Sequence, residues 1–301
     1  MRDLKDFSPR EWLRLLPLQL AFKQLRNDAW LMLYKRLRPG GLPAFLEKIE
    51  PLKGRNIALV IAFEQPWALD WLLRMAKLHL TDTTVLVFDN SRRATARQEI
   101  EKVCSNHSAP YLPLPANPTR HVNRSHGMAM TWVFRNVVQA IKPSLFAFID
   151  HDMIPVQKIE FAQRLGRQPF FGFRRSSKGQ SWNLWAGYCV YDFSQVANTT
   201  LNFLYDFSRG LDTGGRNWKR LYRHHDPASM NFAESRNLEV RDPVTGEQYM
   251  AQVIDDCWFH IGGIGYNDNF RAKFDCCKNL AQAFEQGMNW QQIRIDRQGQ
   301  N

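Results

Sequence analysis

Two aspartates that are one residue apart, Asp150 and Asp152, follow the apolar segment LFAFI at residues 145–149. Residues i and i+2 of an extended chain project to the same side, so both carboxylates can reach one ligand while His151 points away. Two carboxylates this close repel each other, and a bound cation removes that repulsion. Hard oxygen ligands suit Mg²⁺ or Mn²⁺. The alternative is a pair of solvated acids in a surface turn.

Acidic side chains also follow two earlier apolar segments. NIALVIAF at residues 56–63 ends at Glu64, and TVLVF at residues 84–88 is followed by Asp89 and Asn90. In open parallel sheets, ligands bind outside the carboxyl ends of the strands. We therefore expect the side chains after all three segments to share one rim, where a cation makes the clustering favourable.

Aromatic residues cluster in SWNLWAGYCVYDF at residues 181–193. Trp182, Trp185 and Tyr188 lie beside Gly187, which leaves space for a ring. Aromatic faces stack on flat or ring-shaped ligands, so these residues are candidates for a ligand pocket; the alternative is packing in the core. RHHDP at residues 223–227 does not suggest a metal site, because adjacent histidines point in different directions.

The elements that position these residues alternate between strands and helices. Apolar runs predict strands at 56–63, 84–91, 111–115 and 145–150, and periodic segments predict helices at 66–80, 94–107 and 127–142. This alternation is typical of an α/β fold with a mostly parallel sheet and helices on both faces. Beyond residue 170 the sequence predicts strands at 170–175 and 184–193, a helix over 194–207, and a strand–turn–strand unit over 239–263.

The N-terminal segment differs from the rest in charge. The chain has 301 residues and a net charge of +11, and residues 1–40 carry nine Lys or Arg against four acids. Residues 10–38 are predicted to be helical, with Leu15, Leu18, Phe22, Leu25, Ala29 and Leu33 on one stripe. This helix either lies on an anionic membrane surface or packs on its own domain. We expect a helical N-terminal segment at 1–54, an α/β domain at 55–290 and a polar tail at 291–301.

Composition narrows the location and the partners. The five cysteines have no CxxC spacing, which favours a reducing compartment over a disulfide framework or a zinc site. The N-terminus lacks the apolar segment of a signal peptide, and no apolar run is long enough to span a membrane. We expect a cytoplasmic protein, peripheral on the cytoplasmic face of a membrane if the N-terminal helix binds there. Basic residues are spread out, so no nucleic-acid partner is expected.

The order of these pieces resembles the glycosyltransferases of the GT-A fold, and among them the inverting group called family 2. The resemblance covers residues 55–265 and rests on IALVIAFEQP, VLVFDNS, NRSHGMAMTW, FAFIDHDMIP and LDTGGRNW. It implies transfer of a sugar from a nucleoside-diphosphate sugar, expected to be UDP-linked, to a glycan or lipid-linked acceptor. It further implies that Asp150 and Asp152 bind Mn²⁺ or Mg²⁺ together with the donor.

The resemblance also implies roles for other residues. It implies that the donor nucleotide binds at the ends of the first two strands and at the start of a helix that begins with small residues. It also implies that a histidine late in the chain, His260, is a further metal ligand. Asp212 is the match for the base that deprotonates the acceptor, although the family's usual Glu-Asp pair is Leu211-Asp212 here. Asp212 can equally cap a helix, and His260 can equally be a core histidine. The donor candidates are Phe63, Glu64, Asp89, Asn90, Arg124, Ser125, His126 and Gly127, and the acceptor candidates are Trp182, Trp185, Gly187, Gly214 and Gly215.

Basic residues near these positions can neutralise the charge that develops on a diphosphate leaving group. The candidates are Arg120, Arg124, His126, Arg174 and Arg175. Two other functions are consistent with the sequence. A nucleotidyltransferase of similar fold is one, although FEQPW lacks the Gly-rich basic loop that such enzymes carry after the first strand. A non-enzymatic module that binds nucleic acid or membrane is the other.

Overall fold

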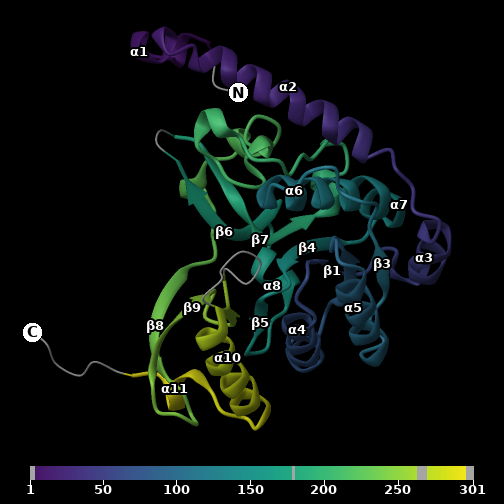
Figure 1. The fold of residues 1–301 in the computed structure, drawn as a ribbon, viewed down its shortest axis with the longest axis vertical. Coiled ribbons are helices and arrows are strands. Elements are labelled where there is room, and N and C mark those ends of the chain that lie inside the picture. Colours follow the sequence, from purple (N-terminus) through teal and green to yellow (C-terminus); the bar gives the residue numbers. More distant parts are fainter. Residues whose placement is uncertain (1–3, 178–179, 263–269, 296–301) are drawn as a thin grey trace, which may run out of the picture.

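A computed structural model describes residues 4–177, 180–262 and 270–295. Its centre is a six-stranded sheet of order β3-β2-β1-β4-β7-β6 (Figure 1). The strands of this sheet are β1 (Ile57–Ala62), β2 (Thr84–Asp89), β3 (Tyr111–Pro113), β4 (Leu145–Asp150), β6 (Phe170–Ser176) and β7 (Trp182–Asp192). Strands β1 to β4 run parallel, and β7 and β6 are antiparallel additions at one side. The expected mostly parallel α/β sheet is confirmed.

Helices cover both faces of this sheet. Figure 1 shows α4 and α5 on one side and α6 and α7 on the other. The helices are α1 (Pro9–Leu13), α2 (Leu16–Tyr34), α3 (Leu42–Ile49), α4 (Pro66–His79), α5 (Ala94–Asn106), α6 (Val122–Val133), α7 (Gln139–Ile141), α8 (Phe161–Leu165), α9 (Phe193–Val196), α10 (Phe270–Glu285) and α11 (Trp290–Ile293). The segment η3 (Phe134–Val138), a π-helix, joins α6 to α7.

Two hydrophobic cores lie on the two faces of the sheet, and β1 contributes to both. Ala58, Val60 and Ala62 pack in one core with α4 and α5, whereas Ile57 and Leu59 pack in the other with α3 and α6. Side chains alternate between the faces of a strand, so a strand buried on both faces must be apolar throughout. This is why β1 appears in the sequence as an uninterrupted apolar run.

The register of the parallel strands brings their carboxyl ends to one edge. Ala62 pairs with Asp89, and Ile61 pairs with Asp150. The last residues of β1, β2 and β4 therefore lie side by side, as the sequence predicts. A second, antiparallel sheet of order β5-β10-β9-β8 lies below this edge and packs against α10 (Figure 1). Its strands are β5 (Met153–Pro155), β8 (Ser235–Arg241), β9 (Gln248–Ile254) and β10 (Trp258–His260).

The single helix predicted over residues 10–38 is two helices, α1 and α2. Leu15 has a left-handed backbone (φ 51°) between α1 and α2, and Pro17 occupies the first turn of α2. Proline has no N–H and its ring collides with the carbonyl four residues earlier, so a helix cannot run through it undistorted. No helix among the described residues is both long and apolar enough to cross a membrane.

The helix predicted over 194–207 is wrong for most of its length. Only Phe193–Val196 is α-helical, and the segment from residue 197 to 217 is held by hydrogen bonds within itself and to α6. Asn217 Oδ1 accepts from the Asn202 amide at 2.7 Å, and Thr131 Oγ1 accepts from the Phe203 amide at 2.9 Å. These partners satisfy the backbone without a helix. In the predicted polar tail, Ile293 is buried, and residues 296–301 lie outside the described part.

Candidate functional site

A cavity of about 260 Å³ opens at the carboxyl ends of β1, β2 and β4. Several residues singled out in the sequence line it. They are Phe63, Asn90, Ser125, His126, Asp150, Asp152, Trp185, Asp212 and His260. The structure therefore brings together side chains from β1, β2, α6, β4, β7, the 197–217 loop and β10.

Asp150 ends β4 and faces α6. His126 Nε2 lies 3.4 Å from Asp150 Oδ1. Burial, with the charge of Asp152 as the second cause, raises the pKa of Asp150 well above its ordinary value. Burial also lowers the pKa of His126, to about 4, so this imidazole is neutral at pH 7. Without a cation, the site therefore resists holding two ionised carboxylates.

Asp152 faces the second sheet. Its Oδ2 accepts a hydrogen bond from the Gly262 amide at 3.0 Å and lies 3.7 Å from His260 Nε2. His260 Nδ1 lies 2.6 Å from Gln252 Oε1, while the Gln252 amide nitrogen donates to Ser235 Oγ. Nδ1 therefore donates to Gln252, and Nε2 is the ring nitrogen that faces the carboxylate.

Asp152 and His260 fit a divalent cation. A bare imidazole nitrogen facing a carboxylate is unfavourable unless a cation or a proton lies between them. A histidine that binds a metal usually donates its other ring N–H to an oxygen acceptor, which fixes the orientation of the ring. Gln252 Oε1 is such an acceptor for His260. Within the described ranges, however, no three His, Cys, Asp or Glu side chains form a group that could hold a metal ion by themselves. The remaining ligands would have to be water or the oxygens of a bound diphosphate.

His151 does not point away from the cavity, as the sequence alone suggests. It lines the cavity, and its Nε2 is buried without a hydrogen-bond partner in the described structure. The prediction assumed that the chain stays extended through Asp152. Instead β4 ends at Asp150, and residues 151 and 152 form a turn, so the alternation of a strand no longer applies.

Gly187 of β7 allows two side chains of the site to approach each other. A Cβ atom at this position would lie 2.5 Å from Asp150 Oδ2 and 2.4 Å from the ring of Trp185. Trp185 in turn contacts His260 edge to face, with 4.9 Å between ring centroids. Gly187 is thus a requirement of the site's packing, although it does not itself line the cavity.

Asp212 reaches the cavity from the 197–217 loop. Its Oδ1 accepts hydrogen bonds from Asn123 Nδ2 at 2.9 Å and from the Thr213 amide at 2.8 Å. Arg175 lies 3.5 Å from Oδ2. Asp212 does not begin an α-helix. Gly214 and Gly215 follow Asp212 and do not line the cavity. The Gly214 amide donates to Phe203 O at 2.7 Å. A Cβ atom at Gly215 would lie 2.5 Å from Leu211 Cβ, so the close packing here requires glycine.

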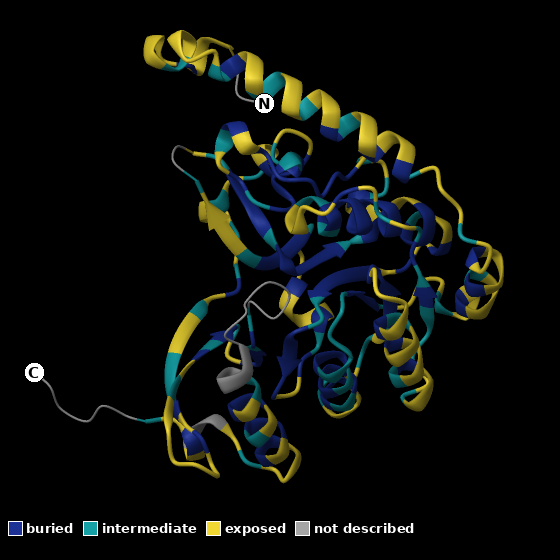
Figure 2. Cartoon of the chain, viewed as in Figure 1, coloured by how far each residue is buried: buried dark blue, intermediate teal, exposed yellow. Residues whose placement is uncertain are grey.

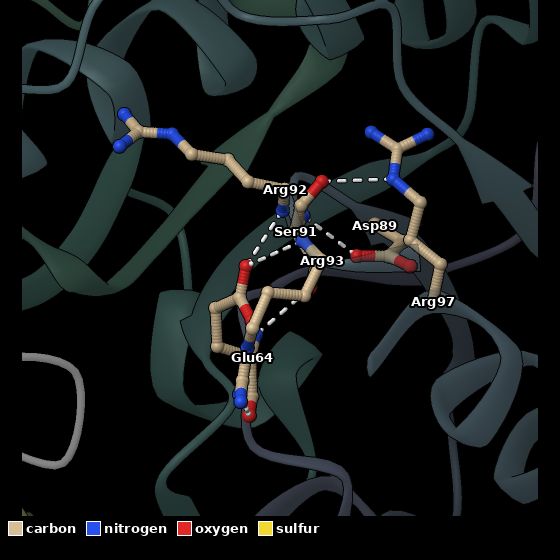
Figure 3. Close-up of polar contacts among 6 residues, drawn as sticks. All are labelled: Glu64, Asp89, Ser91, Arg92, Arg93 and Arg97. Atoms are coloured by element: carbon tan, nitrogen blue, oxygen red, sulfur yellow. Dashed lines mark hydrogen bonds and ion pairs between the residues drawn. The ribbon is translucent and has the colours of Figure 1, made fainter. Parts of the chain in front are cut away.

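Glu64 and Asp89 lie outside the cavity lining, and both carboxylates bind protein groups (Figure 3). Glu64 accepts from the amides of Arg92 and Arg93 and pairs with the Arg93 side chain. Asp89 is buried and accepts from the Ser91 amide at 2.8 Å and from Tyr111 Oη at 3.0 Å. In this structure they order the loop after β2, and donor binding by either residue stays a prediction.

Arg124, Gly127 and Trp182 are also outside the cavity lining. Arg124 donates to Tyr205 Oη and Thr119 Oγ1. A Cβ at Gly127 would lie 2.4 Å from Phe203 O, so this glycine lets α6 pack against the loop that carries Asp212. Trp182 is buried against the ring of Tyr222, which is the core packing weighed for it above.

Several cavity residues were not singled out from the sequence. Asn123, Gln252 and Arg92 are among them; usable signals were the position of Asn123 at the start of NRSHGMAMTW and that of Arg92 directly after the second strand end. Of the basic candidates, Arg120, His126 and Arg175 line the cavity. Arg174 lies instead over the ring of Phe232, with its guanidinium carbon 5.0 Å from the centroid.

Comparisons with known proteins yield only distant similarity. No family model matches the chain, and no curated protein sequence matches it. Among solved structures, TarS of S. aureus has 13% identity and a TM-score of 0.34, covering 50% of this chain and 30% of that one. The galactosyltransferase LgtC, in complex with donor and acceptor sugar analogs, has 11% identity and a TM-score of 0.35, covering 48% and 59%. The bifunctional glycosyltransferase WbbM has 10% identity and a TM-score of 0.34, covering 54% and 34%.

The chain thus spans between 30% and 59% of the length of these structures. Because the TM-scores are below 0.5, we argue the function from the geometry of the cavity alone.

Proposed function

We propose that this protein is a metal-dependent glycosyltransferase. It would move a sugar from a nucleoside-diphosphate sugar, expected to be UDP-linked, to a hydroxyl of a glycan or lipid-linked acceptor, with inversion. One observation carries the proposal: a single cavity joins the strand-end carboxylates Asp150 and Asp152 to a third carboxylate, Asp212, that comes from a separate loop. Two groups of acids in one cavity suit two tasks, binding a diphosphate with its cation and removing a proton.

The donor side of the cavity would stabilise the leaving group. When a sugar departs from a nucleoside diphosphate, negative charge develops on the diphosphate, and a bound Mg²⁺ or Mn²⁺ neutralises it. Asp152 and His260 would hold the ion, with Asp150 close by. Arg92, Arg120 and Arg175 line the same cavity and add positive charge. Fixed charges of this kind need no reorganisation as the bond breaks.

The acceptor side would supply the base. Asp212 is held through Oδ1 by Asn123 and by the Thr213 amide, which leaves Oδ2 directed toward Arg175. A carboxylate positioned in this way can remove the proton of an acceptor hydroxyl as it attacks. Attack from the face opposite the leaving group inverts the anomeric carbon. Trp185, which also lines the cavity, offers a flat surface on which a sugar ring can stack.

The experiment is to measure nucleotide release from a panel of nucleotide sugars, with and without Mn²⁺, and to repeat it with Asp152→Asn. We expect the variant to lose roughly 100-fold in kcat/KM, as when a main electrostatic contact to the leaving group is removed. Calorimetric titration with UDP and Mn²⁺ provides a second readout that needs no acceptor. Asp256→Asn is the matched control, because Asp256 is exposed and pairs with Arg236 away from the cavity.

Full activity in the presence of a chelator, or full activity of Asp152→Asn, would contradict the metal assignment. Failure to bind any nucleotide sugar would contradict the whole proposal. Release of pyrophosphate from a nucleoside triphosphate and a sugar phosphate would favour a nucleotidyltransferase instead.

A further inference from the structure

Helix α2 uses one face for the fold and leaves an apolar stripe on the other. Toward the body, Asn27, Leu31 and Tyr34 are buried, and Asn27 Nδ2 donates to Tyr205 Oη at 3.2 Å. On the outer side, Phe22 and Leu25 are 67% and 69% exposed. In Figure 2 most of the α2 ribbon has the colour of exposed residues, interrupted by the buried and intermediate residues of the packed face. The rest of the stripe consists of Leu18, Ala29, Met32 and Leu33, all exposed.

Basic side chains flank this stripe along both edges. At 100° per residue, Arg26 lies at one edge of the stripe, next to Leu33, and Lys35 lies beyond Met32 on the other side; Lys23 is exposed further round the helix, toward the packed face. The nearby acids already have partners: Glu11 closes the cap of α1 with Ser8, and Asp28, which lies on the Lys35 side of α2, pairs with Arg216. The outward surface of α2 is therefore apolar in the middle and cationic at its edges.

A cavity of about 500 Å³ lies between α2 and η3, at the edge of the stripe that carries Lys35. Three cations, Lys35, Arg135 and Arg220, line it together with one carboxylate, Asp28, and Met32 of the stripe is also part of the lining. Burial, followed by the charges of Arg135, Arg36 and Arg220, lowers the pKa of Lys35. The one carboxylate of the lining, Asp28, already pairs with Arg216, so the cavity keeps an excess of positive charge that would attract an anion. A phosphate group is the anion whose charge and hydrogen-bond acceptors fit such a set.

We propose that α2 lies on an anionic phospholipid bilayer, with its apolar stripe at the acyl–headgroup boundary and the Lys35 cavity over a lipid phosphate. Amphipathic helices with an apolar face and a basic flank bind such surfaces. A second copy of the chain is a poorer occupant, because it brings the same positive charge to the contact, and each chain carries +11. The docking is independent of the function proposed for the other cavity.

This docking would place the proposed acceptor side of the active site near the bilayer. Tyr205, which accepts from Asn27 of α2, also accepts from Arg124 of α6 and belongs to the same loop as Asp212. The loop is thus packed between α2 and the catalytic cavity. This consequence, unlike the docking itself, rests on the proposed function, and it suits an acceptor held in the membrane.

The test is flotation of the full chain with vesicles of phosphatidylcholine alone and of phosphatidylcholine mixed with phosphatidylglycerol. We expect binding to the anionic vesicles only. Phe22→Asp should weaken it about tenfold or more, because burying one aromatic side chain contributes roughly 2 kcal/mol. Lys23→Glu with Arg26→Glu should weaken it at least as much, because each basic residue near an anionic leaflet contributes about 1 kcal/mol. Leu78→Asp on α4 is the control, since Leu78 is also largely exposed (60%) but lies elsewhere.

The substituted side chains are exposed, so the variants should keep the melting temperature of the parent. A loss of vesicle binding can then be distinguished from a loss of folding. Equal binding to both vesicle types, or no loss in Phe22→Asp, would overturn the proposal. A dimer in solution that Phe22→Asp dissociates, without vesicle binding by the parent, would assign the stripe to a second copy. Nucleotide-sugar turnover in solution should be unchanged in Phe22→Asp, so failure of the docking does not imply failure of the proposed function.

Discussion

Asp212, the base of the proposed reaction, has its orientation fixed by the surrounding contacts. Two donors, Asn123 Nδ2 and the Thr213 amide, bind the same oxygen, Oδ1. The side chain therefore has a set orientation before any acceptor arrives. A base must lie within hydrogen-bonding reach of the hydroxyl that it deprotonates, so this orientation is a condition for catalysis.

Asp212→Asn should lower kcat by about 100-fold to 10,000-fold, the usual contribution of a general base, while the KM for the donor changes little. The amide keeps Oδ1 for both donors but cannot accept the proton. Steady-state kinetics with a nucleotide sugar and an acceptor provide the measurement. Asp226→Asn, at an exposed cap that accepts from the Ala228 amide, serves as control. An unchanged kcat would move the base to another residue.

At the scale of elements, the 197–217 loop replaces a predicted helix and needs its own supports. The buried carboxylate of Asp206 accepts from Ser208 Oγ at 2.6 Å and pairs with Arg209 at 2.7 Å. Burial alone would raise the pKa of Asp206, but these hydrogen bonds and the ion pair outweigh it and lower the pKa below its ordinary value. Asp206 therefore stabilises the loop that carries Asp212 when it is ionised.

Asp206→Asn should lower the free energy of unfolding by roughly 3 kcal/mol at neutral pH, because it leaves Arg209 buried without its partner. A carboxylate with a lowered folded-state pKa contributes stability above its unfolded pKa, and that contribution is lost as the pH falls through the folded pKa. The difference between parent and variant should therefore shrink below about pH 4. Urea unfolding across a pH series measures it, and a gap that stays constant with pH would refute the assigned charge.

At the scale of the whole molecule, the N-terminal helices are part of the fold as well as a surface. Leu31 and Tyr34 of α2 are buried in the same core as α3 and α6, and Trp132 Nε1 donates to Leu37 O at 2.9 Å. The sequence left open whether this segment packs on its own domain or binds a membrane. One face of α2 does pack on the domain, and the proposed docking uses the other.

A chain that starts at residue 39 should melt roughly 10 °C below the full chain. Losing the buried Leu31 and Tyr34 side chains removes roughly 3–6 kcal/mol, and each kcal/mol shifts the melting temperature of a domain this large by about 2–4 °C. Thermal unfolding followed by circular dichroism measures the change. Phe22→Asp, which touches only the outer face, should melt with the parent. Equal melting of the truncated chain would show that the segment is an appendage.

The sequence by itself determined the parallel strands and where they end. A strand buried on both faces must be apolar throughout, so β1, β2 and β4 appear in the sequence as apolar runs. The first polar residue after each run marks the carboxyl edge of the sheet, where ligands bind in open parallel sheets. Helix α4 begins at the predicted Pro66, because proline at the first turn loses no hydrogen bond. These features are local, and local patterns predict them.

Only the tertiary structure decided which side chains meet at that edge. Asn123 and Asp212 are 89 residues apart in the sequence, and Asp152 and Gly262 are 110 residues apart. The periodicities of helices and strands relate only residues that are close in the sequence, so they cannot predict these contacts. The direction of a side chain was equally beyond the sequence: Asp89 sits at the predicted edge, yet it binds Ser91 and Tyr111. The physical reason is that a residue type specifies what chemistry is available, whereas the packing of distant elements specifies which groups are within bonding distance.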